Sequence, residues 1–120
     1  MADRVETGSA TIEAALVIPV VLLVLVAVVE LISLAATRLE LVAAAREGAR
    51  VAATTPDPAA AVAAAREVLG DGPATISVVR PAVVGRPAEV VVSVDRPLVT
   101  PLLDVFTVPI RARAVMRVER

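Results

Sequence analysis

The sequence predicts an α+β protein with a long N-terminal transmembrane helix and stalk, a second short helix, and a small antiparallel sheet of about three strands. An uncharged apolar run of sixteen residues, Ala14–Val29, lies near the N-terminus. Prolines at positions 56 and 58 separate a long helical pattern from a short one. Three later segments alternate apolar and polar residues, which is typical of half-buried strands.

The apolar run predicts a membrane anchor over residues 9–36. Ala14–Val29 alone would form about 24 Å of helix. Continued past Glu30 to Ala36, the run is long enough for the roughly 30 Å bilayer core. The alternative is a signal peptide cleaved at the small residues of Ser33–Ala35. More arginines follow the run than precede it, and this count favours a cytoplasmic C-terminus. The N-terminal motif described below implies the opposite orientation.

Residues 37–55 predict a helical stalk that continues from the anchor. Five apolar or small residues fall within about 60° of one another on a helical wheel: Leu34, Leu41, Ala45, Gly48 and Ala52. Small residues permit close approach of another element. This packing stripe could contact neighbouring subunits, the chain's own sheet, or both. Glu47 and Arg50 are spaced as a surface ion pair on the opposite face.

Residues 56–120 predict a small α+β domain. Asp57 is expected to cap a helix that spans 58–69 and ends at Gly70. Strands are expected over 74–80, 89–95 and 109–119, with the apolar members of each alternation on one face. The connection over 97–107 is expected to cover a sheet edge or to contact a partner. A basic strand face, formed by Arg111, Arg113 and Arg117, is interpreted as solvated, with anionic lipid or an acidic partner as the alternatives.

Composition excludes several classes of function. The 120 residues include no Cys and no His, and all twelve basic residues are Arg. Thiolate or imidazole metal sites, Ser-His-Asp triads, P-loop lysines and Schiff-base lysines are therefore excluded. A net charge of -1 argues against nucleic-acid binding. We expect no catalytic residue, no metal, no cofactor, no small-molecule substrate, and hence no enzyme.

The segment Gly8–Glu13, GSATIE, stands directly before the apolar run. Its arrangement resembles the N-termini of type IV pilins and pseudopilins. The wider pattern is similar to the TadE-like family, pseudopilin-like proteins of tight-adherence (Flp) pilus systems. The similarity also includes Pro19 and Glu30 in the anchor, the stalk segment Ala45–Arg50, and the closing segment Arg113–Glu119.

The resemblance implies that a prepilin peptidase cuts between Gly8 and Ser9 and removes a leader of residues 1–8. Glu13 would then be the fifth residue and would pair with the freed amine of a neighbouring subunit. The N-terminus would lie at the cytoplasmic face and the C-terminal domain outside the cell membrane. The implied function is a non-enzymatic minor pseudopilin-like component of pilus assembly or a related secretion system. Its partners would be pilus or pseudopilin subunits and the assembly machinery. The alternative function is a secreted or membrane-anchored binding module.

Overall fold

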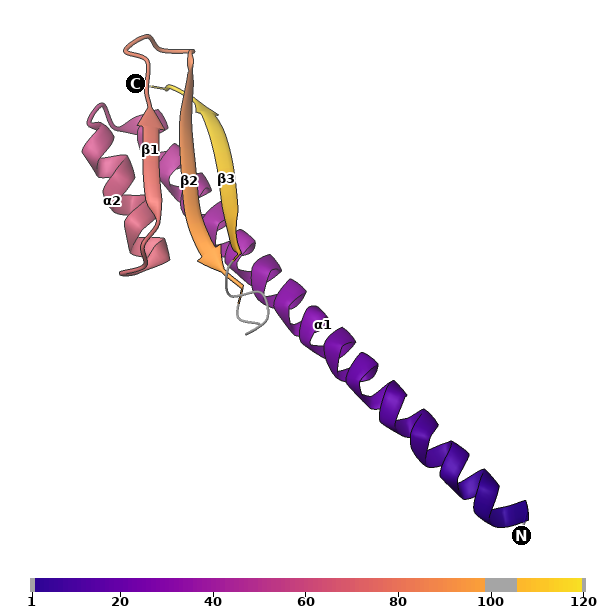
Figure 1. Cartoon of the computed structure of the whole chain (residues 1–120). Coiled ribbons are helices and arrows are strands. Elements are labelled where there is room, and N and C mark those ends of the chain that lie inside the picture. The colour runs from indigo at the N-terminus through magenta and orange to yellow at the C-terminus, as the bar shows by residue number, and fades with distance from the viewer. Residues whose placement is uncertain (1, 99–105, 120) are drawn as a thin grey trace. The chain divides into compact units, whose positions relative to one another are not determined.

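The computed structural model describes residues 2–98 and 106–119, with side chains from residue 8 onward. Helix α1 spans Ala2–Thr54 and helix α2 spans Pro58–Leu69. Strands β1, β2 and β3 span Thr75–Val79, Pro87–Pro97 and Thr107–Arg117 (Figure 1). The predicted α+β fold is therefore confirmed: a long apolar N-terminal helix, a second short helix and a three-stranded antiparallel sheet.

The chain divides into two compact units, one ending at Ser33 and one beginning at Leu34. The first unit is the N-terminal part of α1. It contains Pro19 within the helix. Membrane helices tolerate proline because other groups can satisfy the carbonyl that loses its amide partner.

The second unit contains the rest of α1, α2 and the sheet. The sheet order is β1-β2-β3, so β2 is central. β2 pairs with β1 over Val79↔Glu89 to Thr75↔Ser93, and with β3 over Pro87↔Arg117 to Pro97↔Thr107. β2 is longer at both ends than the predicted 89–95, because β3 pairs along its whole length.

One face of the sheet is covered by helices and the other is not. Buried side chains from the sheet include Val90 and Val92 of β2 and Ala112 of β3, all at even-numbered positions. They join buried residues of α1 and α2 in a single core cluster. The predicted division of strand residues between a core face and a solvent face is thus observed in β1, in β2 and in β3 as far as Ala114. Met116, which was expected on the core face, is exposed.

Local signals at both ends of α2 act as the sequence predicts. The Asp57 side chain accepts a hydrogen bond of 3.0 Å from the Ala59 amide, and Pro58 occupies the first turn. Gly70 ends the helix with a positive φ of 69°, and its amide donates to the Arg66 carbonyl. Most of the connection over 97–107 lies outside the described residues. Its ends are joined by a 3.1 Å hydrogen bond from the Leu98 amide to the Phe106 carbonyl.

Candidate functional site

The N-terminal unit presents apolar side chains on every side of α1. From Gly8 to Val29 each described side chain is exposed, including Leu16 and Leu23 at 70% and 65%. A helix of this length and composition could cross a membrane. Since the chain buries none of this surface, burial as a core helix does not account for its composition.

The predicted processing residues lie at the start of this exposed segment. Gly8, Ser9 and Glu13 are exposed and belong to α1. A β-carbon added at Gly8 would meet nothing within 4 Å. Ser9 and Glu13 are one turn apart on the same side of the helix. The Glu13 side chain forms no hydrogen bond or ion pair with a described side chain, so its carboxylate is available to a partner. Cleavage at Gly8 stays a prediction, and it would require this turn of helix to unwind.

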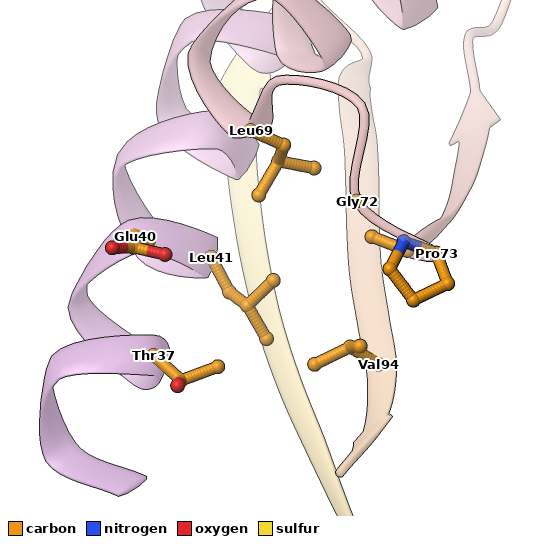
Figure 2. A pocket seen from close by; sticks show the side chains of 8 residues that line it. Thr37, Glu40, Leu41, Leu69, Gly72, Pro73 and Val94 are labelled. Atoms are coloured by element: carbon orange, nitrogen blue, oxygen red, sulfur yellow. The ribbon is translucent and has the colours of Figure 1, made fainter. Parts of the chain in front are cut away.

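A small cavity of about 160 Å³ lies between α1, the turn after α2, and β2 (Figure 2). Its lining is mainly apolar: Thr37, Glu40, Leu41, Leu69, Gly72, Pro73, Ala74 and Val94. Glu40 supplies the single carboxylate, and the Thr37 hydroxyl accepts a hydrogen bond from Arg96. The described residues include no group of three potential metal ligands. The cavity therefore brings together no acid, base and nucleophile that could act as a set.

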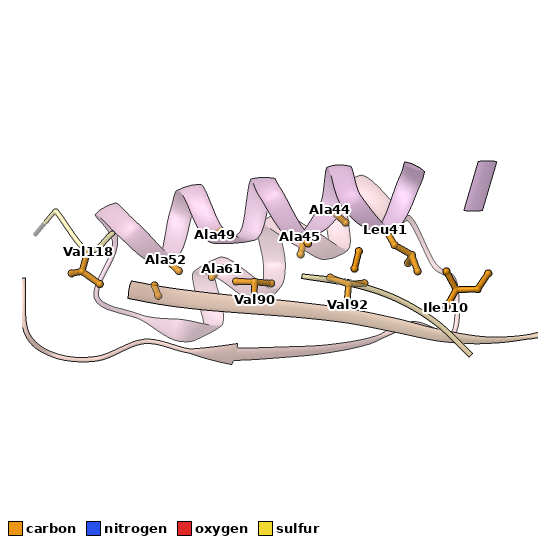
Figure 3. Packing of buried hydrophobic residues seen from close by; sticks show 13 residues of the cluster. Leu41, Ala44, Ala45, Ala49, Ala52, Ala61, Val90, Val92, Ile110 and Val118 are labelled. Atoms are coloured by element: carbon orange, nitrogen blue, oxygen red, sulfur yellow. The ribbon is translucent and has the colours of Figure 1, made fainter. Parts of the chain in front are cut away.

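The packing stripe lies in the core of the second unit (Figure 3). Leu41, Ala45, Gly48 and Ala52 are buried, and Leu34 packs against the cluster at its edge. Gly48 is at the closest approach. A β-carbon added there would lie 3.2 Å from the Ala61 carbonyl oxygen, from Ala65 Cβ and from Val90 Cγ1. The chain's own sheet and α2 therefore contact this stripe, and contact with other subunits stays a prediction.

The predicted surface pair on α1 forms as expected. Arg50 contacts both carboxylate oxygens of Glu47, at 3.0 Å through Nε and 2.5 Å through Nη2. This hydrogen bonding lowers the pKa of the Glu47 carboxyl, against a smaller raising effect of desolvation. The same bond raises the pKa of Arg50. Both side chains face solvent, so the pair contributes little to folding.

The basic strand face is exposed, as its alternation predicts. Arg111, Arg113 and Arg117 all project from β3 on the side away from the helices. Arg113 donates a 2.9 Å hydrogen bond to Glu89 of β2, a cross-strand ion pair. Arg111 and Arg117 form no ion pair with a described side chain. Two cations of this face thus remain available to an anionic group.

Comparison with known sequences adds one finding to this geometry. Residues 8–50 match the family model described as TadE-like protein. The TadE-like match covers just over a third of the chain and lies wholly within α1. It includes the Gly8–Glu13 segment, the apolar run and Ala45–Arg50, so the TadE-like resemblance predicted from these residues is confirmed. No match was found among curated proteins or solved structures.

Two arginines stabilise the domain beyond the TadE-like segment, and the sequence did not indicate their roles. Arg66 of α2 donates 3.0 Å hydrogen bonds to the carbonyls of Gly72 and Ala74. Arg80 donates a 2.6 Å hydrogen bond through Nε to the Ala52 carbonyl of α1. The only available signal was their position, in the last turn of a helix and just after a strand. Carbonyl groups commonly lack partners at such places.

Proposed function

We propose that this chain is a non-enzymatic, membrane-anchored minor pseudopilin-like component of tight-adherence (Flp) pilus assembly or a related secretion system. One observation carries the proposal. A fully exposed apolar helix follows directly on the Gly8–Glu13 segment, and both lie inside the TadE-like match. Exposed surface of this extent is costly in water and is covered by lipid or by other anchors.

The proposed topology is a single pass with the N-terminus at the cytoplasmic face and residues 56–120 outside. In this arrangement a prepilin peptidase removes residues 1–8 from the cytoplasmic side. The new amine of Ser9 and the carboxylate of Glu13 then lie at the end of the anchor. A carboxylate beside lipid is costly unless it is paired. Pairing Glu13 with the amine of a neighbouring subunit removes that cost and favours an axial offset between subunits.

Support for a structural role comes from the domain itself. Its core consists mainly of alanine and valine, and its cavity holds one carboxylate. The partners proposed are pilus or pseudopilin subunits, the assembly machinery, the peptidase and the membrane. Nucleic acid is not among them, because the chain has a net charge of -1. We propose no small-molecule substrate, since the cavity beside Leu41 has a mainly apolar lining with one carboxylate.

A secreted or anchored binding module is the second candidate. The observation that favours it is the division of the chain between Ser33 and Leu34, next to the small residues that resemble a signal-peptidase site. Cleavage after Ala35 would release a chain that keeps α2, the sheet and nearly all of the core.

N-terminal sequencing of the membrane-extracted protein discriminates the two candidates. Ser9 as the first residue supports the pseudopilin proposal, whereas Ala36 supports the secreted module. Met1 or Ala2 as the first residue would instead support an anchored assembly factor that is not processed. Protease added to intact spheroplasts should remove a C-terminal tag from the processed protein. A tag that stays protected would contradict the proposed orientation.

A further inference from the structure

The two edges of the sheet differ in length and in what covers them. β1 forms one edge with five residues, and α2 packs beside it (Figure 1). β3 forms the other edge with eleven residues, and no described strand pairs with its outer side. Exposed strand edges present unpaired amide and carbonyl groups that can pair with another strand.

The register defines which groups of β3 point outward. The Val118 amide donates to the Arg86 carbonyl at 2.8 Å, and the Leu98 amide donates to the Phe106 carbonyl at 3.1 Å. The residue pairs Arg86–Val118 and Leu98–Phe106 continue the β2–β3 register by one residue at each end. Hydrogen-bonded pairs recur every second residue in an antiparallel ladder. Even-numbered residues of β3 therefore bond to β2, and odd-numbered residues direct their amides and carbonyls to the outer edge.

Pro109 is consistent with this assignment. It is an odd-numbered residue, so its nitrogen, which carries no hydrogen, lies at the outer edge and no bond to β2 is lost. Beyond it, four outward amides remain in sequence along the edge: Arg111, Arg113, Val115 and Arg117.

The edge at β1 is blocked, in contrast. The same alternation makes the carbonyl of Ala74 point outward from β1, and Arg66 donates a hydrogen bond to it. A helix beside a five-residue strand, with a guanidinium on its edge carbonyl, leaves little room for another strand. No described side chain makes a comparable bond to the outer carbonyls of β3.

We propose that the outer edge of β3 binds an extended segment of a partner protein in which acidic and apolar residues alternate, adding it as a fourth strand. The proposal stands independently of the function proposed above. Acidic side chains of the added strand lie beside Arg111 and Arg117 on the outer face of the sheet. Its apolar side chains lie on the helix face beside Ala114 and Met116, which is 37% exposed.

Charge argues against a second copy of β3 as the occupant. Outward groups of two antiparallel copies can pair only between odd-numbered residues. If the two copies pair symmetrically about Ala114, Arg111 of each copy lies opposite Arg117 of the other. Moving one copy along the other to the next allowed register places Arg113 opposite Arg113 in one direction and Arg113 opposite Arg117 in the other direction. Like charges directly opposite one another destabilise a strand pair. The arginines thus prevent self-association while they favour an acidic strand.

Amide hydrogen exchange of the full chain, ¹⁵N-labelled in zwitterionic micelles, tests the proposal with the peptide VEVEVEV as probe. The outward amides of Arg111, Arg113, Val115 and Arg117 should exchange fast in the free protein. Peptide at ten times its Kd should slow them about tenfold, since protection follows the bound fraction. The amides of Ala112 and Ala114, already bonded to β2, should not change.

Two control peptides and three variants of the chain make the result specific. VKVKVKV should give no protection, and neither should VEVEVEV N-methylated at alternate residues, which lacks the donors for a ladder. Val115→Pro should weaken binding by removing one outward donor, whereas Val115→Thr should bind as well as the native chain. Arg117→Glu leaves the backbone unchanged and should weaken binding of VEVEVEV, which keeps the test decisive if the proline variant does not fold.

Several outcomes would overturn the proposal. Outward amides that are already slow in the free protein would mean that the edge is covered. Equal protection by the glutamate and lysine peptides would remove the role of the arginines. Concentration-dependent dimerisation that protects the same amides would identify a second copy as the occupant. Nanodiscs of anionic lipid that shift the arginine resonances, with no peptide protection, would identify lipid as the ligand of this face.

Discussion

Gly48 of α1 lies over Val90 of the central strand, and a β-carbon added at Gly48 would come within 3.2 Å of Val90 Cγ1. The Ala61 carbonyl oxygen is at the same distance from that point and belongs to a helix backbone, which cannot rotate away. The position is therefore closed to larger side chains, and this contact determines how near α1 can approach both the sheet and α2.

Gly48→Leu should destabilise the second unit by about 3 kcal/mol, the upper part of the range for overpacked cores. Gly48→Ala should change stability much less, because alanine gains up to about 1 kcal/mol in helix propensity against the crowding. Guanidinium unfolding of the detergent-solubilised chain, followed by circular dichroism, measures both. Gly72→Ala is the control, since its β-carbon would meet only the Leu69 carbonyl oxygen at 4.0 Å. Equal stability of the Leu variant and this control would refute the close packing.

Opposite faces of the sheet should respond differently to charge. Val92 is fully buried, so Val92→Asp should destabilise the domain by about 4 kcal/mol or more through an unpaired buried charge. Arg113→Gln removes only an exposed pair with Glu89 and should change stability by less than about 1 kcal/mol. The same unfolding experiment compares the two variants. Equal free energies of unfolding for the two variants would show that the strand faces are assigned incorrectly.

The stability that the Glu47–Arg50 pair contributes should depend on pH. The pKa of Glu47 is lowered in the folded chain by its hydrogen bond from Arg50. Stability from this pair is therefore present above the unfolded pKa and is lost as the pH falls through the folded pKa. Arg50→Gln should raise the Glu47 pKa toward its usual value, which carboxyl-carbon NMR titration measures. Arg46→Gln is the control, and in this variant the pKa of Glu47 should stay lowered. An unchanged Glu47 pKa in Arg50→Gln would mean that the pair does not form in solution.

Processing and assembly should separate in two variants at the N-terminus. Gly8→Leu should leave a full-length precursor in the membrane, because the proposed scissile site has lost its glycine. Glu13→Ala should still be cut but should not support pili, while Glu13→Asp, which keeps the carboxylate, should retain piliation at least in part. Mature mass and piliation are measured in the same strains. Normal piliation of the Glu13→Ala strain would contradict a role in assembly. Glu13 would then only stabilise the start of the helix, where a carboxylate interacts favourably with the helix dipole.

Features with local causes could be predicted from the sequence. The bounds of α2 follow from Asp57, Pro58 and Gly70, each of which acts within one turn. The strand faces follow from alternation. The sequence also placed Leu41 and Gly48 on one side of α1, but a helical wheel carries no information about what covers that side. The answer depends on contacts with α2 and β2, which are distant in sequence.

The ends of β2 show why the strand bounds were harder to predict. Pro87 and Pro97 lie outside the predicted strand 89–95 but inside β2, although proline cannot donate to a ladder. Both are odd-numbered, and odd-numbered residues of β2 face β1. β1 pairs only between Glu89 and Ser93, so each proline points to a side where no strand is paired. The same reasoning could not be applied from the sequence, because the strand order and the length of β1 were unknown.

Val118 is 1% exposed and belongs to the same core cluster as Leu41, seventy-seven residues earlier. Translation at about 5–20 residues per second separates the two by about 4–15 s. During that interval the alanine-lined side of α1 has been made, but the strands that bury it have not. A newly made chain therefore passes through a period in which this surface is open to chaperones or to other newly made chains, and the period closes only when β3 joins the sheet.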